Sequence, residues 1–271
     1  FIGSAVVREL LANTDCCVVN VDCLTYAGNL ATLSDIAESK YYVFEQMNIC
    51  DAHSVRRLFQ KHNPTGVIHL AAESHVDRSI DSADDFVQTN IIGTYTLLEA
   101  VRTHHLEQGR SGRSGCRFLH VSTDEVFGSL GTGGLFSEQS PYEPNSPYSA
   151  SKASADHLVR AWGETYDLNT SISNCSNNYG PYQYPEKLVP VVIDKAIAGE
   201  PIPVYGAGEN VRDWLYVSDH ARALTKILFD GRPGRRYNIG GNSEKRNIDV
   251  VKTICNILDE IKPLETLPNR E

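Results

Sequence analysis

The side chains best suited to chemistry gather between residues 118 and 152. An apolar run, F-L-H-V, leads straight into Thr123, Asp124 and Glu125. Two adjacent carboxylates at the end of a buried strand are costly to bury, and they offer a general acid and a general base at one edge of a core. We therefore expect a catalytic site in this segment.

Tyr148 and Lys152 follow one loop later, four residues apart, so they share a face if their segment is helical. Ser146 is a good N-cap and Pro147 a favoured first helical residue, which predicts a helix reaching about residue 166. An ammonium ion beside a phenol lowers the pKa of the phenol, so the pair predicts a tyrosine base. The alternative is an ordinary helix with a packed tyrosine and a surface lysine, because a Tyr-x-x-x-Lys match arises easily by chance.

The elements around this segment alternate between strand and helix. Short apolar runs predict parallel strands at 17–21, 41–47, 67–71, 118–121 and 170–175. Helical patterns fall at 52–62, 84–105 and 147–166. This alternation predicts an α/β fold with a doubly wound, Rossmann-like parallel sheet, which binds ligands at the carboxyl ends of its strands. His75 lies near one such end, where we expect a hydrogen-bonded loop histidine rather than a catalytic one.

Residues 3–22 fit the tail of a dinucleotide-binding βαβ unit, in which a glycine turn precedes a helix and an acidic residue ends the next strand. On this interpretation Gly3 is the last glycine of the turn. The first strand and the other glycines would precede residue 1, so we expect an N-terminal truncation. Asp22 would bind a ribose 2′-hydroxyl and repel a 2′-phosphate, which favours NAD over NADP. The alternative is a helix followed by an ordinary strand that ends at Asp22.

The pattern becomes irregular beyond residue 176. Helical patterns and short apolar pieces alternate there, at 187–198, 202–205, 214–217, 218–229 and 248–261. We predict an NAD-binding domain over 1–176 and a smaller, mainly substrate-binding lobe over 177–271 that is interleaved with the main sheet.

The composition argues against several classes of protein. A net charge of −9 argues against a nucleic-acid surface, because phosphate backbones are bound by many Lys and Arg side chains. No apolar run approaches membrane-spanning length, so we expect a soluble protein with no membrane partner. Seven cysteines without a C-x-x-C pair indicate reduced thiols, which predicts a cytoplasmic location, and we expect no metal site.

Motifs spread over nearly the whole chain carry a family resemblance. They are F-I-G-S at the start, V-D-C-L-T-Y-A-G-N from Val21, L-A-A-E-S-H-V-D-R-S-I from Leu70, S-T-D-E-V-F-G from Ser122, Y-S-A-S-K from Tyr148, N-N-Y-G-P-Y-Q-Y-P-E-K-L from Asn177 and R-D-W-L-Y-V from Arg212. The sequence resembles the extended short-chain dehydrogenase/reductase superfamily and, within it, the nucleotide-sugar 4,6-dehydratases. Sister epimerases share Tyr-x-x-x-Lys but typically lack the Asp-Glu pair, so T-D-E is the most specific motif.

The resemblance implies bound NAD, dTDP-glucose as the nucleotide-sugar substrate, and a homodimer. Cofactor contacts are expected from Gly3, Asp22, Thr25, Asn48, Ile49, Ala71, Ala72, Ser74, Thr89, Tyr148, Lys152 and Asn178. Substrate contacts are expected from Ser74, Thr123, Asn177, Lys187, Leu188, Val204, Tyr205, Arg212 and Asn247. Lys187 and Arg212 can meet the pyrophosphate, and Tyr205 can pack near the base. Family members usually carry aspartate at the position of Asn48, whose amide oxygen can still accept from the adenine amino group.

The resemblance also implies dehydration by internal redox. Tyr148, supported by Lys152, would remove the C4 hydroxyl proton as hydride passes to NAD, with Thr123 bonded to the same oxygen. Glu125 would then remove the C5 proton while Asp124, kept protonated, donates to the departing C6 hydroxyl, and hydride returns to C6. Two nearby carboxyls resist ionising together, which suits one of them to acid catalysis. A nucleotide-sugar 4-epimerase and a noncatalytic NAD-binding protein are the alternatives.

Overall fold

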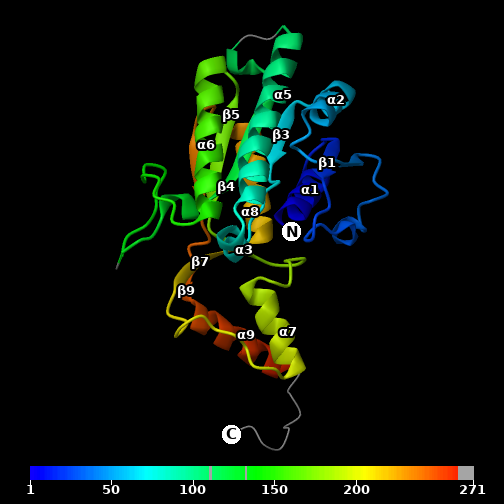
Figure 1. Ribbon diagram of the computed structural model, residues 1–271. Helices are drawn as coiled ribbons and strands as arrows, with labels where there is room; N and C mark the ends of the chain where they lie inside the picture. Colours follow the sequence, from blue (N-terminus) through cyan, green and yellow to red (C-terminus); the bar gives the residue numbers. More distant parts are fainter. Residues whose placement is uncertain (110–111, 132, 262–271) are drawn as a thin grey trace, which may run out of the picture. The chain divides into compact units, whose positions relative to one another are not determined.

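Figure 1 shows a computed structural model of the chain, in which residues 1–109, 112–131 and 133–261 are described. The chain divides into two compact units. The larger contains residues 2–175 and 218–239, and the smaller contains residue 1, residues 176–217 and the chain from 240 onward. The chain therefore leaves the larger unit after residue 175 and returns to it to add one more helix and strand.

Parallel strands form the framework of the larger unit. The strands β3 (Gly66–His69), β4 (Arg117–Thr123), β5 (Thr170–Cys175) and β8 (Arg236–Ile239) form one sheet in the order β3-β4-β5-β8. A second parallel pair consists of β1 (Val18–Asp22) and β2 (Tyr42–Gln46). The predicted α/β class with a parallel sheet is confirmed, and the five predicted strands begin and end within two residues of the observed bounds.

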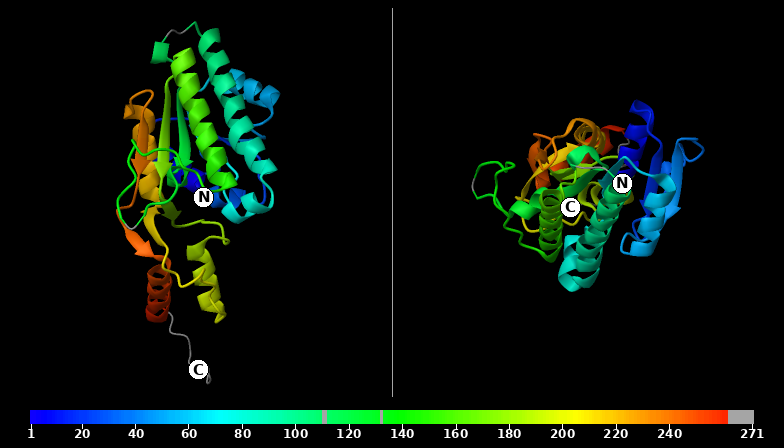
Figure 2. Two further views of the ribbon diagram at one scale, coloured as in Figure 1. Left: turned by 60° about the vertical axis from the view of Figure 1, so that its left-hand side comes forward. Right: turned by 90° about the horizontal axis from the view of Figure 1, so that it is seen from above.

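Helices cover both faces of the four-stranded sheet (Figure 2). On one face α5 (Thr94–Glu107) and α6 (Pro147–Tyr166) lie side by side, and on the other lie α1 (Ile2–Asn13) and α8 (Val217–Asp230). Phe118 of β4 packs into the cluster that includes α2 (Ala52–His62), α5 and α6, whereas Leu119 and Val121 pack against α1 and α8. Burial from both sides explains why the successive residues Phe118 and Leu119 of β4 are both apolar instead of alternating with polar residues.

The helical pattern predicted over residues 84–105 is confirmed, and the structure divides it into three consecutive helical pieces. The segment consists of α4 (Asp84–Phe86), a π-helical stretch η2 (Val87–Gly93) and α5. Apolar periodicity does not separate an i→i+5 turn from an i→i+4 turn, so the sequence pattern could not reveal the change. The shorter helical pieces are α3 (Val76–Asp81) and the 3-10 turns η1 (Leu30–Leu33), η3 (Gly112–Ser114) and η4 (Asp124–Phe127).

The smaller unit has its own three-stranded sheet. There β6 (Asn177–Tyr179) pairs in parallel with β7 (Val211–Tyr216), and β9 (Glu244–Arg246) runs antiparallel along the other side of β7. The helices α7 (Leu188–Ala198) and α9 (Asn247–Ile261) pack against each other. The end of the predicted lobe, 262–271, lies outside the described residues. Within the described part of the chain, no helix is long and apolar enough to cross a membrane.

Candidate active site

The two predicted catalytic carboxylates lie where β4 ends. Thr123 is the last residue of β4 and the N-cap of η4, where its Oγ1 accepts a hydrogen bond from Glu125 N at 3.2 Å. The same hydroxyl donates to Asp124 Oδ1 over 3.3 Å. Thr123 is buried, Asp124 half-buried and Glu125 exposed. The strand therefore turns into a 3-10 helix that presents both carboxylates at the carboxyl edge of the sheet, the edge where such sheets bind ligands.

Gly128 closes this turn. Its N–H donates to Glu125 O, and its φ of +84° lies in the region that L side chains rarely adopt. A Cβ at this position would lie 2.5 Å from Glu143 O, which is a backbone atom. The glycine that ends T-D-E-V-F-G is therefore required by the turn that carries the carboxylates.

Capping interactions set the start of α6. Ser146 Oγ accepts from Ser149 N at 3.1 Å, Ser149 Oγ accepts from Ser146 N at 3.0 Å, and Pro147 is the first helical residue. This capping box confirms the predicted start of the helix. Tyr148 and Lys152 consequently lie one turn apart on a buried face of α6, with exposed fractions of 9% and 3%.

The phenol of Tyr148 has apolar and negatively charged surroundings. Burial raises the pKa of Tyr148 far above its ordinary value, and Glu125, Cys175 and Asp124 raise it further. A hydrogen bond with Thr123 acts in the opposite direction. The predicted lowering of the Tyr148 pKa is therefore wrong for the chain by itself, because that prediction considered the lysine charge and neither burial nor the carboxylates.

The amine of Lys152 is held by β4. Nζ donates to Val121 O at 2.8 Å and lies 3.4 Å from His120 Nε2. Burial lowers the pKa of Lys152 to about 8, while Asp156 and Cys175 oppose that shift. Asp156 was missed by the sequence analysis, although it follows Lys152 at the spacing by which Lys152 follows Tyr148.

Asp22 and Asn48 both lie at the carboxyl edge of the β1-β2 pair, where Met47 N donates to Asp22 O at 3.1 Å. Asp22 Oδ1 accepts from Leu24 N at 2.7 Å, and Asn48 Oδ1 accepts from Cys50 N at 2.9 Å. Both side chains are therefore oriented by their own loops. The carboxylate of Asp22 and the amide of Asn48 are exposed at this edge.

Asn90 of η2 holds the loop that follows β3. Its Oδ1 accepts from Glu73 N at 2.9 Å, and its Nδ2 donates to Glu73 O at 3.0 Å and to Ser151 Oγ at 2.8 Å. Ser151 Oγ donates in turn to Tyr148 O at 2.7 Å. The predicted cofactor loop 71–74 is thus tied to the helix that carries Tyr148. The sequence analysis missed Asn90, because the sequence alone does not distinguish this buried amide from the exposed amide of Gln88 in the same helical pattern.

The remaining predicted cofactor residues of the larger unit lie on several elements. Ile49 is buried, Ala71, Ala72 and Thr89 are half-buried, Thr25 and Ser74 are exposed, and Gly3 lies in α1 with open space where a Cβ would stand.

His75 is the N-cap of α3 and its side chain accepts from Arg78 N, which confirms the predicted hydrogen-bonded loop histidine.

The predicted substrate residues beyond 176, and Asn178, belong to the smaller unit. Asn177 and Asn178 lie on β6, Arg212 on β7, Lys187 and Leu188 at the start of α7, Val204 and Tyr205 in a loop, and Asn247 at the start of α9. Gly208 allows the loop that carries Val204 to lie against the start of α9. A Cβ at Gly208 would lie 2.9 Å from both Val204 and Ile248, too close for an ordinary contact. Asn247 Oδ1 is buried without a hydrogen-bond partner among the described residues, so it can accept from a ligand.

Residues 1–269 match a family model described as GDP-mannose 4,6 dehydratase. The chain belongs to the GDP-mannose 4,6 dehydratase family. A relative named dTDP-glucose 4,6-dehydratase, from Neisseria meningitidis serogroup B, is 58% identical over 264 residues, which are 97% of this chain and 74% of the relative.

Solved structures agree with this membership of the GDP-mannose 4,6 dehydratase family. The dTDP-glucose 4,6-dehydratase DesIV of Streptomyces venezuelae, solved with NAD bound, has a TM-score of 0.88 and 42% identity, covering 96% of this chain and 78% of that one. A UDP-glucose 4-epimerase of Thermotoga maritima, solved with UDP-glucose, has a TM-score of 0.85 and 28% identity, and the match covers 99% of this chain and 81% of that one.

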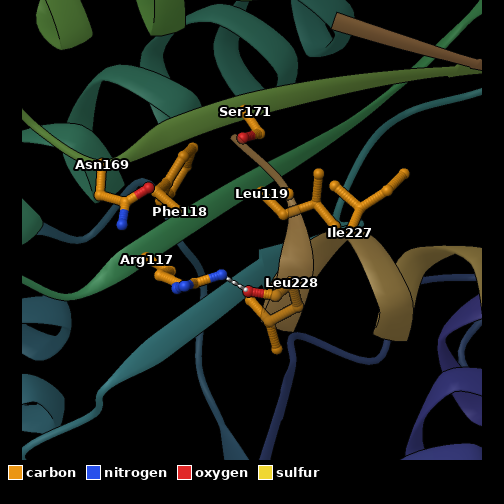
Figure 3. A pocket seen from close by; sticks show the side chains of 8 residues that line it. Arg117, Phe118, Leu119, Asn169, Ser171, Ile227 and Leu228 are labelled. Carbon is orange, nitrogen blue, oxygen red and sulfur yellow. Dashed lines mark hydrogen bonds between the residues drawn. The ribbon is translucent and has the colours of Figure 1, made fainter. Parts of the chain in front are cut away.

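A hollow lies at the opposite end of the strands from Thr123, Asp124 and Glu125 (Figure 3). It is lined at the amino ends of β4 and β5 and at the end of α8, and Arg117 Nη1 there donates to Leu228 O at 2.6 Å. Arg117 and Thr123 stand at opposite ends of β4, roughly 20 Å apart at the usual rise of a strand. The arginine therefore satisfies the last carbonyls of a helix. No group of His, Cys, Asp or Glu in the described ranges is arranged to hold a metal ion.

Proposed function

We propose that this protein catalyses the NAD-dependent dehydration of dTDP-glucose to dTDP-4-keto-6-deoxyglucose. The observation that carries the proposal is that Asp124 and Glu125 lie near enough to Tyr148 to raise the pKa of its phenol, which Thr123 hydrogen-bonds. A base for a sugar hydroxyl and two groups for the neighbouring carbons are thereby available in one place. The 58% identity to a relative named for this reaction supports the proposal.

NAD is the proposed cofactor, and the chain offers residues that fit it. The exposed carboxylate of Asp22 at the end of β1 suits a ribose hydroxyl, and Asn48 shares its edge. The loop 71–74, fixed by Asn90, lies beside the Tyr148 helix. Bound NAD would supply a hydride acceptor for C4 oxidation and the same hydride for return to C6.

Tyr148 is the proposed base for the C4 hydroxyl, with Thr123 bonded to the same oxygen. Because burial and the two carboxylates hold the phenol in its protonated form, the phenolate needs a nearby positive charge. Lys152 supplies that charge from the same helical face. The pair is therefore a base that works only while the lysine is protonated.

Glu125 is the proposed base for the C5 proton, and Asp124 the proposed acid for the departing C6 hydroxyl. Adjacent residues at the start of η4 suit this division, because the two groups must address neighbouring carbons. The hydroxyl of Thr123, within 3.3 Å of Asp124 Oδ1, fixes the orientation of the acid. An oxidised C4 acidifies the C5 proton, so elimination follows oxidation.

The smaller unit is the proposed binding lobe for the nucleotide. Lys187 and Arg212 would meet the pyrophosphate and the exposed Tyr205 would stack on the base. Asn177, Leu188, Val204 and Asn247 would complete the substrate contacts, and Asn178 would reach the cofactor. The unpartnered Oδ1 of Asn247 supports a polar contact at the start of α9.

A homodimer is also proposed. The outer faces of α5 and α6 carry an aromatic row in which Tyr95 and Tyr166 both pack edge-on against Trp162, and Tyr95 is 43% exposed. Exposed aromatic side chains of this kind are typical of protein interfaces. Sedimentation at micromolar concentration should give twice the chain mass, and a monomer would contradict the proposal. A cytoplasmic location stays a prediction.

The decisive experiment incubates the protein, supplied with NAD, with dTDP-glucose and with UDP-glucose in parallel. Loss of one water from dTDP-glucose, seen by mass spectrometry together with a 4-keto signal in NMR, is the expected result. A galacto product of unchanged mass from either substrate would show an epimerase, which shares the fold at a TM-score of 0.85. NAD binding without turnover of either sugar would show a noncatalytic protein.

A further inference from the structure

Asp156 occupies the third position of a row on α6. Tyr148, Lys152 and Asp156 follow one another at intervals of four residues, so their side chains share one face of the helix. Asp156 is 1% exposed, deeper than either of the other two. A carboxylate this deeply buried is costly unless hydrogen bonds and opposite charge compensate it, so its partners should show its purpose.

One oxygen of this carboxylate is fixed from three elements. Oδ2 accepts from Tyr142 OH at 2.8 Å, from Ser122 Oγ at 3.0 Å and from Asn174 Nδ2 at 3.3 Å. These donors lie on the loop before α6, on β4 and on β5. The carboxylate therefore has a single orientation that none of its neighbours sets alone.

The other oxygen faces His120. Oδ1 lies 3.3 Å from His120 Nε2, and the same nitrogen lies 3.4 Å from Lys152 Nζ. Burial lowers the pKa of His120 to about 4, so the imidazole carries no charge near neutral pH. The neutral imidazole of His120 therefore lies between the Asp156 carboxylate and the Lys152 ammonium. These two charged groups are less than about 7 Å apart, a distance at which their Coulomb attraction is still strong in a protein interior.

Burial disfavours the charged form of Lys152, and the titratable groups around the amine act in both directions. The titratable groups that face it are His120 on β4, His69 on β3, Cys175 on β5 and Asp156 on its own helix. Burial lowers the Lys152 pKa, and Asp156 is the largest influence that raises it. Burial also acts to raise the pKa of Asp156, but the interactions of its carboxylate with His120, Lys152 and Tyr142 outweigh burial, so the Asp156 pKa is lowered.

We propose that Asp156 is a positioning residue, whose negative charge acts across the neutral ring of His120 to keep Lys152 in its charged form on the helical face that carries Tyr148. The role of that charge rests on the proposed dehydratase function, whereas the effect of Asp156 on Lys152 does not. Removing the carboxylate removes the larger of the two influences that oppose burial and leaves only that of Cys175, so Lys152 should lose its proton at lower pH. An opposite charge within about 4–6 Å shifts a pKa by about 1–3 units, so about one unit, the low end of that range, is expected for this pair.

The test is the titration of Lys152 itself, followed by NMR of protein labelled with ¹³C at lysine Cε and identified by its absence in Lys152→Arg. The full chain is used without substrate, so the result does not depend on turnover. The wild-type midpoint should be near 8, and Asp156→Asn should move it down by about one pH unit. The asparagine keeps an acceptor for the three donors, which preserves the shape of the site.

Two further variants separate charge from packing. Tyr142→Phe removes one hydrogen bond to Oδ2 and keeps the carboxylate, so its midpoint should stay within a few tenths of wild type. Asp156→Ser is a second neutral variant for the case that Asp156→Asn does not fold. An unchanged midpoint in a folded neutral variant would overturn the proposal, as would a wild-type midpoint near the ordinary lysine value or an equal shift in Tyr142→Phe.

Turnover gives an independent readout if the proposed function holds. The alkaline limb of kcat against pH should move down in Asp156→Asn by as much as the NMR midpoint. If the NMR shift occurs and no dehydration is seen in any variant, the proposed function fails and the role of Asp156 stands. If dehydration is normal and the midpoint does not move, the role of Asp156 fails alone.

Discussion

Replacing Asn90 by alanine should destabilise the protein and loosen the proposed cofactor loop. Asn90 is 1% exposed and makes three side-chain hydrogen bonds, of 2.9, 3.0 and 2.8 Å, two to the Glu73 backbone and one to Ser151 Oγ. A buried hydrogen bond contributes about 1 kcal/mol, so the loss should be about 3 kcal/mol. For a unit of this size that corresponds to a fall in Tm of roughly 6–12 °C.

An isosteric change sharpens this prediction. Asn90→Asp can still accept from Glu73 N, but it loses both donor bonds and sets a carboxylate against the carbonyl of Glu73. The variant should therefore be at least as unstable as Asn90→Ala at pH 7 although it leaves no cavity. Its deficit should shrink at acid pH, where the buried carboxyl takes up a proton.

The assay is thermal and urea unfolding of each variant, together with the amount of NAD retained per chain after purification. Gln88→Ala is the matched control, because Gln88 lies in the same π-helical stretch with an exposed side chain, and it should stay within about 0.5 kcal/mol of wild type. If Asn90→Ala lost less than about 1 kcal/mol and retained NAD normally, the clamp assigned to Asn90 would be wrong.

Three further outcomes are expected. Glu125→Gln should retain NAD but form little 4-keto-6-deoxy sugar, and undiminished turnover would contradict its role as the C5 base. Gly128→Ala should lose about 1–3 kcal/mol in urea unfolding, because its φ is +84° and the new Cβ meets Glu143 O; stability equal to wild type would disprove the clash. Burial lowers the pKa values of His120 and His220 from 6.5 to about 4. As the pH falls, these histidines therefore take up protons in the unfolded chain before they do so in the folded chain. The free energy of unfolding should fall between pH 6.5 and pH 4, by about 3 kcal/mol for each histidine. Urea unfolding at several pH values checks this, and constant stability across that range would contradict the neutral burial of both side chains.

The sequence was most informative where local chemistry and periodicity agree. Phe118, Leu119 and Val121 are apolar because helices cover both faces of the strand that ends at Thr123, and the helix after Ser146 begins with caps that act within one turn. Both features are properties of neighbouring residues, so a single sequence reveals them. The π-helical stretch around Asn90 has the same apolar spacing as an ordinary helix and could not be recognised in this way.

Partners that are distant in the chain account for what sequence reasoning missed. Asp156 receives hydrogen bonds from Ser122, 34 residues before it, and from Asn174, 18 residues after it. Its spacing from Lys152 was visible, but its burial and its contact with His120 depend on how three elements pack. The error about the Tyr148 pKa has the same origin, because burial is a tertiary property.

The raised pKa of Tyr148 links the two halves of the proposed mechanism. Glu125 and Asp124, which would make dehydration possible, are also the charges that disfavour the phenolate needed for the first oxidation. In a site that combines this carboxylate pair with Tyr-x-x-x-Lys, the lysine must therefore be more fully protonated than in a site that lacks the carboxylates. Lys152 is itself pushed toward neutrality by burial, and Asp156 is the negative group placed to resist this from the side away from the reaction. By keeping Lys152 charged, Asp156 would then offset the unfavourable effect of Asp124 and Glu125 on the Tyr148 phenolate.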